Sequence, residues 1–315
     1  MPNQTFKPLV SIIIPVYNGS DYMREAIDSA LSQTYDNVEV IVVNDGSNDG
    51  GETERIAKEY GEHIRYIYKE NGGVSTALNT GIKAMKGEYF SWLSHDDVYM
   101  PNKVENQIRA LANLDDKSTL VCCEYINIDK NSNIIENMHT VVSPKFGIIS
   151  WEEMLVRLFT IGPMHGCSLL IHKSVFENAG LFDETLRYFQ DGYMWYKIFM
   201  KRYSLLSIPD ICVKGRLHDK QLTQTGKAIF RRDSEKVSQQ MIPELISIST
   251  ADNNYLKAYI NYNAKYGNKK VVKRAIAEAK DYKLISFKDK ISIYILSGYG
   301  IVRPIIRKIY HTIFR

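Results

Sequence analysis

The run VSIIIPVYN, residues 10–18, opens the first regular element of the chain, and the fold class follows from it. Its β-branched start, residues 10–14, is too short for a helix, and a turn begins at Pro15. Apolar residues then recur at helical spacing between Tyr22 and Leu31. This part of the sequence therefore predicts a strand, a turn and a helix, in that order.

The same unit repeats twice along the chain. An apolar run over 38–43 predicts a second strand, and a turn through Asp45 leads to a polar helix over 52–60. A third strand over 64–68 is followed by a helix over 75–85. Apolar strands that alternate with helices predict an α/β fold with a mostly parallel sheet flanked by helices.

Two adjacent carboxylates, Asp96 and Asp97, follow an apolar run over 89–93 that predicts a fourth strand. In open parallel sheets, ligands bind beyond the carboxyl ends of the strands. Adjacent carboxylates repel each other unless a cation or hydrogen-bond donors lie between them, so a divalent metal is one interpretation. The other is that they cap the helix predicted over 102–114, and this stretch alone leaves both interpretations open.

The second half of the chain alternates less regularly. Its predicted elements are helices over 151–159 and 191–201, a hairpin or loop over 127–138, and strands over 120–123, 168–171, 205–208 and 211–214. From about residue 228 the pattern is helical throughout, with breaks expected at Pro243 and Gly267. The sequence therefore predicts a main domain over 1–227 and a C-terminal α-helical appendage over 228–315.

Composition places the chain among ordinary globular proteins. Its 315 residues are 44% hydrophobic and 24% charged, with a formal net charge of +4. The cysteines form neither a C-x-x-C pair nor a metal-ligand spacing, which predicts small buried side chains and no disulfide. No secretory signal opens the sequence, so we expect a cytoplasmic protein.

The C-terminal part is strongly basic. Residues 265–315 carry 13 Lys and Arg against 3 Asp and Glu. Within 302–313, apolar and basic residues fall on opposite faces of a helix, and the uncharged run 291–302 is too short to span a bilayer. We expect this tail to lie on an anionic membrane surface, peripheral at the inner face, or else to pack on the protein as an ordinary amphipathic helix. No aromatic-interleaved basic stretch accompanies it, so no nucleic-acid partner is expected.

The turns that follow the early strands should meet at one edge of the sheet. They carry Tyr17 and Asn18, then Asp45, then the glycines 72–73, and finally the acidic pair 96–97. The sequence contains neither G-x-G-x-x-G after the first strand nor a phosphate-binding G-x-x-x-x-G-K-[ST] motif. What remains is a nucleotide whose base is held by an aspartate and whose diphosphate is held through a metal.

These motifs, taken together, resemble glycosyltransferase family 2, whose members have the Rossmann-like GT-A fold. The resemblance rests on residues 10–18, on VNDGS at 43–47, on NGG at 71–73 with Asn79, and on the acidic pair, and it covers about residues 9–225. It divides the main domain into a nucleotide-binding part over about 9–115 and an acceptor-side part over about 116–227. It implies an inverting, metal-dependent transfer of a sugar from a UDP- or dTDP-sugar to a carbohydrate hydroxyl. The acceptor would be a growing polysaccharide or glycan, with a lipid-linked acceptor suggested by the basic tail.

The resemblance also implies roles for particular residues. Nucleotide-binding residues would be Pro15, Val16, Tyr17, Asn18, Asp45, Gly73, Asn79, Asp96 and Arg216. The metal, Mn²⁺ or Mg²⁺, would be held by Asp97 first of all, with Asp96 and His218. Asp191, in FQD at 189–191, takes the position of the catalytic base, and its alternative is a helix cap.

Three further features qualify this assignment. Arg216 and His218, with Gln221 and Thr223, resemble a family loop that closes over the diphosphate, and the dipeptide 165–166 is a weaker candidate for the acceptor side. The family usually has an acid where Ser94 stands. It often has an arginine where Leu78 stands, which leaves the choice between UDP and dTDP open.

Two other classes of function compete with this one. A nucleotidyltransferase would need a basic, glycine-rich loop after the first strand, and residues 15–20 contain no Lys or Arg. A non-catalytic nucleotide-sugar-binding subunit is disfavoured because the chain keeps Asp45, the pair 96–97 and Asp191 together. Whether the chain forms a homo-oligomer stays open.

Overall fold

The computed structural model describes residues 6–140, 145–219, 227–249, 254–265 and 268–281. The chain divides into two compact units. The first comprises Met1–Ser150 and Pro163–Lys227, and the second comprises Trp151–Gly162 and Ala228–Arg315. Residue 227 ends the first unit, as it ends the predicted main domain, whereas the segment 151–162 groups with the C-terminal helices.

A parallel layer of four strands forms the first half of the first unit. The strands are β1 (Val10–Val16), β2 (Val38–Asp45), β3 (Arg65–Lys69) and β4 (Tyr89–Trp92). They lie in the order β3-β2-β1-β4 with every neighbouring pair parallel, which confirms the predicted α/β layer. β1 is buried along its whole length, so both faces of the sheet are covered there, and β3 is the edge strand.

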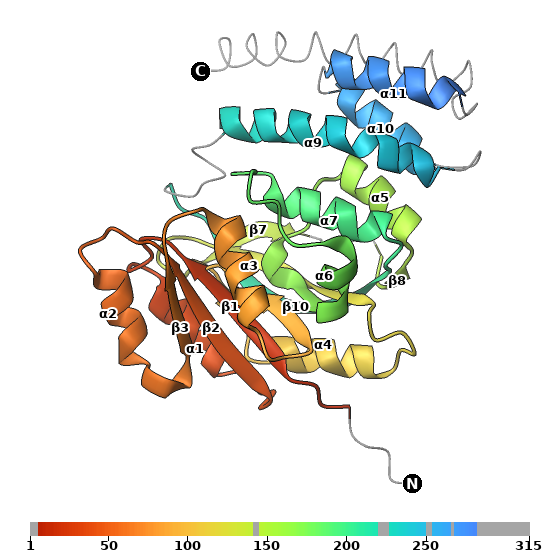
Figure 1. Cartoon of the computed structure of the whole chain (residues 1–315). Coiled ribbons are helices and arrows are strands. Elements are labelled where there is room, and N and C mark those ends of the chain that lie inside the picture. The colour runs from red at the N-terminus through yellow and green to blue at the C-terminus, as the bar shows by residue number, and fades with distance from the viewer. Residues whose placement is uncertain (1–5, 141–144, 220–226, 250–253, 266–267, 282–315) are drawn as a thin grey trace. The chain divides into compact units, whose positions relative to one another are not determined.

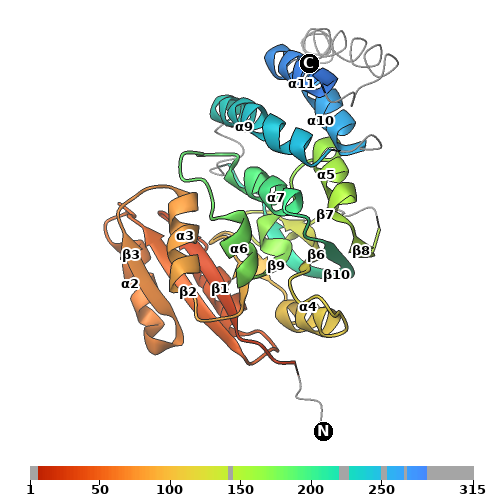
Figure 2. The same ribbon diagram turned by 45° about the vertical axis from the view of Figure 1, so that its right-hand side comes forward.

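The connecting helices are α1 (Met23–Leu31), α2 (Glu52–Glu59) and α3 (Val74–Ala84). α3 packs directly on β1 and β2, as Figures 1 and 2 show. Its Gly81 permits this close approach, because a Cβ there would stand 2.4 Å from Cγ2 of Ile13. The carboxyl ends of β1, β2 and β4 therefore share one edge of a tightly packed layer.

The second half of the unit turns the sheet into a mixed one (Figure 2). Its elements are β5 (Val98–Tyr99), α4 (Lys103–Ala112), β6 (Leu120–Ile128), β7 (Ile134–Thr140), β8 (Gly147–Ile149), β9 (Leu169–His172), α6 (Lys173–Ala179), α7 (Gln190–Met200) and β10 (Leu205–Arg216). β9 pairs antiparallel with both β4 and β6, and β6 runs parallel to β10. The sheet continues from the parallel layer without a break, so the main domain has a single sheet.

The two strands predicted over 205–208 and 211–214 take a different form in the structure, and the hairpin or loop predicted over 127–138 is a hairpin. The strands expected over 205–208 and 211–214 are one strand, β10, whose register against β6 shifts between Ser207 and Ile211. Pro209 lies at this irregularity, and a proline has no N–H to donate to the sheet. The polar stretch 127–138 is the hairpin of β6 and β7, whose turn is held by Asp129.

The second unit is helical. It contains α5 (Trp151–Thr160), α9 (Lys227–Ser247), α10 (Asn254–Lys265) and α11 (Lys269–Asp281). α10 packs against both α5 and α11, and the rings of Phe159 and Tyr259 lie 5.2 Å apart between their centroids. The predicted break at Pro243 is wrong, because this proline lies inside α9 between the buried residues Ile242 and Leu245. The packing of these two side chains offsets the free-energy cost of the one backbone hydrogen bond that the proline removes.

The predictions made for Gly267, Gln221, Thr223 and the tail over 302–315 fall outside the described residues. Among the helices of the described ranges, none is both long and apolar enough to cross a membrane.

Candidate active site

The turn after β1 is tied to the turn after β2. Asn18 adopts a left-handed backbone conformation with φ of 49°, which asparagine tolerates better than most residues. Its side-chain amide donates to Oδ1 of Asn48 at 2.7 Å and accepts from the Asn48 backbone N–H at 2.8 Å. Tyr17 beside it is 44% exposed, whereas Pro15 and Val16 are buried within β1. Of the predicted nucleotide-binding residues 15–18, Tyr17 and Asn18 thus present side chains at the sheet edge.

Asp45 and the glycine turn come together as predicted. Oδ1 of Asp45 accepts from the Gly72 N–H at 3.0 Å, and Oδ2 accepts from the Gly73 N–H at 2.7 Å. The Lys69 ammonium lies 2.6 Å from Oδ1. Gly73 has a φ of +91°, and a Cβ there would also stand 2.7 Å from Nη1 of Arg187. Arg187, on the segment that precedes α7, is therefore brought to this edge although the sequence did not single it out.

The Asn79 side chain makes hydrogen bonds within the protein, whereas the prediction gave it a contact with the nucleotide. Its buried amide donates to the Phe182 carbonyl at 2.9 Å and to Glu184 Oε1 at 2.8 Å, and it accepts from the Phe182 N–H at 3.0 Å. Because all three bonds go to one segment far along the chain, Asn79 holds the GLFDE motif, residues 180–184, against α3.

The two carboxylates of the acidic pair, Asp96 and Asp97, contact different partners. Asp96 Oδ2 lies 3.1 Å from Nε2 of His218. Asp97 Oδ1 accepts from the Arg216 backbone N–H at 2.9 Å, and its Oδ2 accepts from the Cys167 thiol at 3.2 Å. Burial would raise the pKa of Asp96, but the His218 hydrogen bond and the nearby His95 outweigh it and lower that pKa. Burial, and then the charge of Asp96, raise the pKa of Asp97.

Arg216 is enclosed by protein groups, which differs from the predicted role of a phosphate clamp. Its side chain is buried, and it donates to the Asp96 carbonyl at 2.7 Å and to Ser132 Oγ at 2.9 Å. It also forms an ion pair with Glu25 and lies over the Tyr22 ring, 4.4 Å from the ring centroid. The guanidinium thus joins α1, the acidic turn and the hairpin of β6 and β7.

Asp191 lies in the first turn of α7. Its Oδ1 accepts from the Gly192 N–H at 2.7 Å, so a backbone group of the same helix fixes the orientation of the carboxylate. Burial raises the pKa of Asp191, while the neighbouring His165 favours the ionised form. A carboxylate with a raised pKa is suited to taking up a proton.

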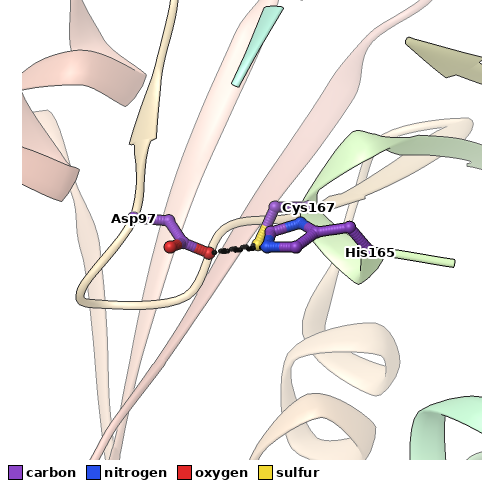
Figure 3. A group of neighbouring side chains, drawn as sticks. All are labelled: Asp97, His165 and Cys167. Atoms are coloured by element: carbon purple, nitrogen blue, oxygen red, sulfur yellow. Dashed lines mark hydrogen bonds and ion pairs between the residues drawn. The ribbon is translucent and has the colours of Figure 1, made fainter. Parts of the chain in front are cut away.

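His165 and Cys167 lie on either side of Gly166 and face Asp97, as Figure 3 shows. His165 Nε2 lies 3.6 Å from Asp97 Oδ2, and its ring lies 4.5 Å from that of Tyr125. All four cysteines of the chain are buried, but Cys167 stands within ligand distance of a histidine and a carboxylate. From the sequence, His165 is a weak acceptor-side candidate and Cys167 is expected to be only a small buried side chain, because Asp97 lies 70 positions away from Cys167.

The sequence was compared with known families and proteins. The family model described as Glycosyl transferase family 2 matches residues 11–180. A glycosyltransferase of Rickettsia typhi is 45% identical over 323 residues, and the match covers 98% of both chains. The chain belongs to glycosyltransferase family 2. Another family relative, from Rickettsia prowazekii, is 52% identical over 228 residues, which are 72% of this glycosyltransferase and 69% of the relative.

Solved structures confirm the GT-A fold of this glycosyltransferase. Residues 1–349 of S. aureus TarS superpose with a TM-score of 0.66 at 15% identity, covering 95% of this chain and 91% of that one. The mannosyltransferase PcManGT from Pyrobaculum calidifontis, in complex with GDP-Man and Mn²⁺, has a TM-score of 0.55 at 20% identity, covering 96% and 82%. Identities this low establish the fold alone.

Proposed function

We propose that this glycosyltransferase is an inverting, metal-dependent enzyme that transfers a sugar from a UDP- or dTDP-sugar to a hydroxyl of a glycan. The observation that carries the proposal is the Asp96–His218 pair beyond the end of β4, on the same edge of the sheet as Asp45. TarS, which shares the fold, has also been crystallised with UDP-GlcNAc. A UDP donor is consistent with that neighbour.

The Asp96–His218 pair suits Mn²⁺ or Mg²⁺. The lowered pKa of Asp96 keeps its carboxylate ionised, and a carboxylate oxygen with an imidazole nitrogen is a donor set that Mn²⁺ accepts. Asp97 is the weaker candidate for direct ligation of this ion, because Arg216 and Cys167 already occupy its two oxygens. A cation held here would offset the negative charge that develops on the leaving nucleoside diphosphate.

Asp45 is proposed to bind the base. Oδ1 of Asp45 already accepts from Gly72 and Lys69, while Oδ2 accepts from Gly73. That oxygen has capacity for one more donor, which the ring N–H of uracil or thymine would supply. Tyr17, exposed at the same edge, offers an aromatic face for the base.

Asp191 is proposed to be the general base. The acceptor hydroxyl would give its proton to this carboxylate as the hydroxyl oxygen bonds to the anomeric carbon of the sugar. The bond from that carbon to the diphosphate breaks at the same time, on the opposite face, which inverts the configuration. The Gly192 N–H holds Oδ1 of this carboxylate, and Oδ2 would receive the proton.

Calorimetric titration with a panel of UDP- and dTDP-sugars, with and without Mn²⁺, tests the donor and metal assignments. We expect one donor class to bind more tightly with Mn²⁺, and Asp96→Asn and His218→Gln to remove that gain. Asp36→Asn is the matched control, because this exposed carboxylate pairs with Lys7 away from the acidic turn in the sequence. Mn²⁺ that left donor binding unchanged in the wild type would overturn the metal assignment.

The membrane-side role is also proposed. We expect a lipid-linked acceptor at the cytoplasmic face of the membrane, because residues 265–315 are strongly basic. Full-length protein should co-sediment with phosphatidylglycerol vesicles, and the triple change Arg303→Glu, Arg307→Glu and Lys308→Glu should reduce that binding. Equal binding by the two proteins would contradict the role of the tail.

A further inference from the structure

We propose that Asp97, His165 and Cys167 form a second cation site, one that takes a thiolate-seeking divalent ion of the Zn²⁺ class (Figure 3). This site is separate from the Asp96–His218 pair and does not depend on the proposed function. It would hold the acidic turn in place through Asp97, whereas His218 contacts the turn through Asp96.

The distances fit a four-coordinate ion. Cys167 Sγ lies 3.2 Å and His165 Nε2 lies 3.6 Å from Asp97 Oδ2, and all three ligand atoms lie within 4.8 Å of one another. Tetrahedral zinc, with bonds of about 2.0–2.3 Å, separates its ligand atoms by about 3.3–3.7 Å. Two of the three separations are therefore already close to those around one tetrahedral ion, and the third is at most 4.8 Å.

The donor set selects the class of ion. A thiolate with an imidazole and one carboxylate oxygen suits Zn²⁺ or Co²⁺, whereas Mg²⁺ prefers oxygen ligands alone. Asp97 and Cys167 are almost fully buried, and the His165 side chain is 24% exposed, so the ion and a fourth ligand, water, have access from the histidine side. On binding, the Cys167 S–H bond breaks, the sulfur lone pair binds the ion, and the proton passes to the buffer.

Each ligand is supported by a neighbour, as ligands in metal sites usually are. The Ser94 backbone N–H donates to Cys167 Sγ at 3.2 Å, which favours a thiolate. The Arg216 N–H holds the other oxygen of Asp97. Gly215 makes room for His165, because a Cβ at 215 would stand 3.3 Å from Nε2.

The simpler interpretation is that the Cys167 thiol only donates a hydrogen bond to Asp97. In this arrangement, however, the same buried oxygen, Asp97 Oδ2, lies 3.2 Å from the thiol sulfur and 3.6 Å from an imidazole nitrogen. A divalent cation would replace the thiol proton and bind all three atoms. The presence of His165 as a third donor distinguishes a cation site from a single hydrogen bond.

The test is a Co²⁺ titration of the full-length protein, followed by electronic absorption, in the presence of excess Mg²⁺ to fill oxygen-only sites. We expect a saturable thiolate-to-cobalt charge-transfer band in the near ultraviolet, which stoichiometric Zn²⁺ removes. Cys167→Ser should abolish the band, and His165→Gln should weaken Co²⁺ binding by at least about 10–100-fold. Cys122→Ser, a change at another buried cysteine, should keep it.

Two further results decide the proposal. Asp96→Asn should leave the band in place, because its carboxylate faces His218, and loss of the band in this variant would refute a separate site. Absence of a thiolate band in the wild type, or its survival in Cys167→Ser, would overturn the proposal outright. If Cys167→Ser does not fold by circular dichroism, His165→Gln decides, since unchanged Co²⁺ affinity there also overturns it.

Discussion

Replacing Asp191 by asparagine should separate catalysis from folding. Asparagine keeps an acceptor oxygen for the Gly192 N–H, now 2.7 Å from the carboxylate, so the first turn of α7 retains its bond. Only the capacity to take up a proton is lost. General-base catalysis contributes about 10²–10⁴-fold to a rate, which at 1.36 kcal/mol per tenfold is about 3–5 kcal/mol of activation free energy. We expect kcat to fall by that factor.

The measurement combines nucleotide release, donor binding and thermal unfolding. Donor affinity of Asp191→Asn should stay within about twofold of the wild type, and the free energy of unfolding should change by less than about 1 kcal/mol, because the hydrogen bond is conserved. Asp36→Asn, at an exposed ion pair, is the control for loss of a carboxylate. A fully active Asp191→Asn protein would remove this residue from catalysis, and equal losses of binding and rate would make its role structural.

The pH profile supplies an independent check on the same residue. A general base must be ionised, and burial raises the pKa of Asp191 above the ordinary value of about 3.9. The rate of the wild type should therefore fall as the pH is lowered through this raised pKa. The residual rate of Asp191→Asn should lack that acidic limb.

Three other changes have definite expected outcomes. Arg216→Met removes the buried donor to the Asp96 carbonyl and Ser132 Oγ and breaks the ion pair with the part-exposed Glu25, so it should cost about 1–3 kcal/mol in unfolding free energy, measured by denaturant titration; a loss under about 0.5 kcal/mol would contradict the enclosed arrangement. Gly166→Ala places a Cβ 2.3 Å from the Trp92 ring and should lower the free energy of unfolding by about 1–3 kcal/mol. A thermal melt should show a fall in Tm of about 2–12 °C, and an unchanged Tm would show that the ring moves aside at no cost. Asp45→Asn replaces a charged acceptor and should weaken nucleotide binding by about tenfold in calorimetry, whereas unchanged affinity would argue that the base binds elsewhere.

Much of the fold was predictable because local patterns dominate it. β1 and β2 are apolar runs, and the same strand-turn-helix spacing repeats at β3, so this repeated pattern identifies the three units. β5, with two residues, β8, with three, and the short α6 are too brief to give a periodic signal. β5 and β8 form because β10 offers them hydrogen-bonding partners, with which both pair antiparallel.

The site was predictable only in part. Asp45 and the glycine turn could be brought together because parallel strands end at one edge. The separation of Asp96 from Asp97 could not, because it depends on partners 122 and 70 positions away. Arg216 resembled a phosphate ligand in the sequence, yet its burial beside Glu25 is a property of long-range packing.

The amino-acid sequence alone determines the strand-turn-helix units and their order. These units follow from local backbone preference and from the period of apolar side chains. The direction in which each carboxylate points came from tertiary packing. Asp96 and Asp97 are adjacent in the sequence, but packing brings a different partner to each. The Asp96 carboxylate therefore points toward His218 and the Asp97 carboxylate toward Cys167. A buried carboxylate needs donors, and the structure determines where they are.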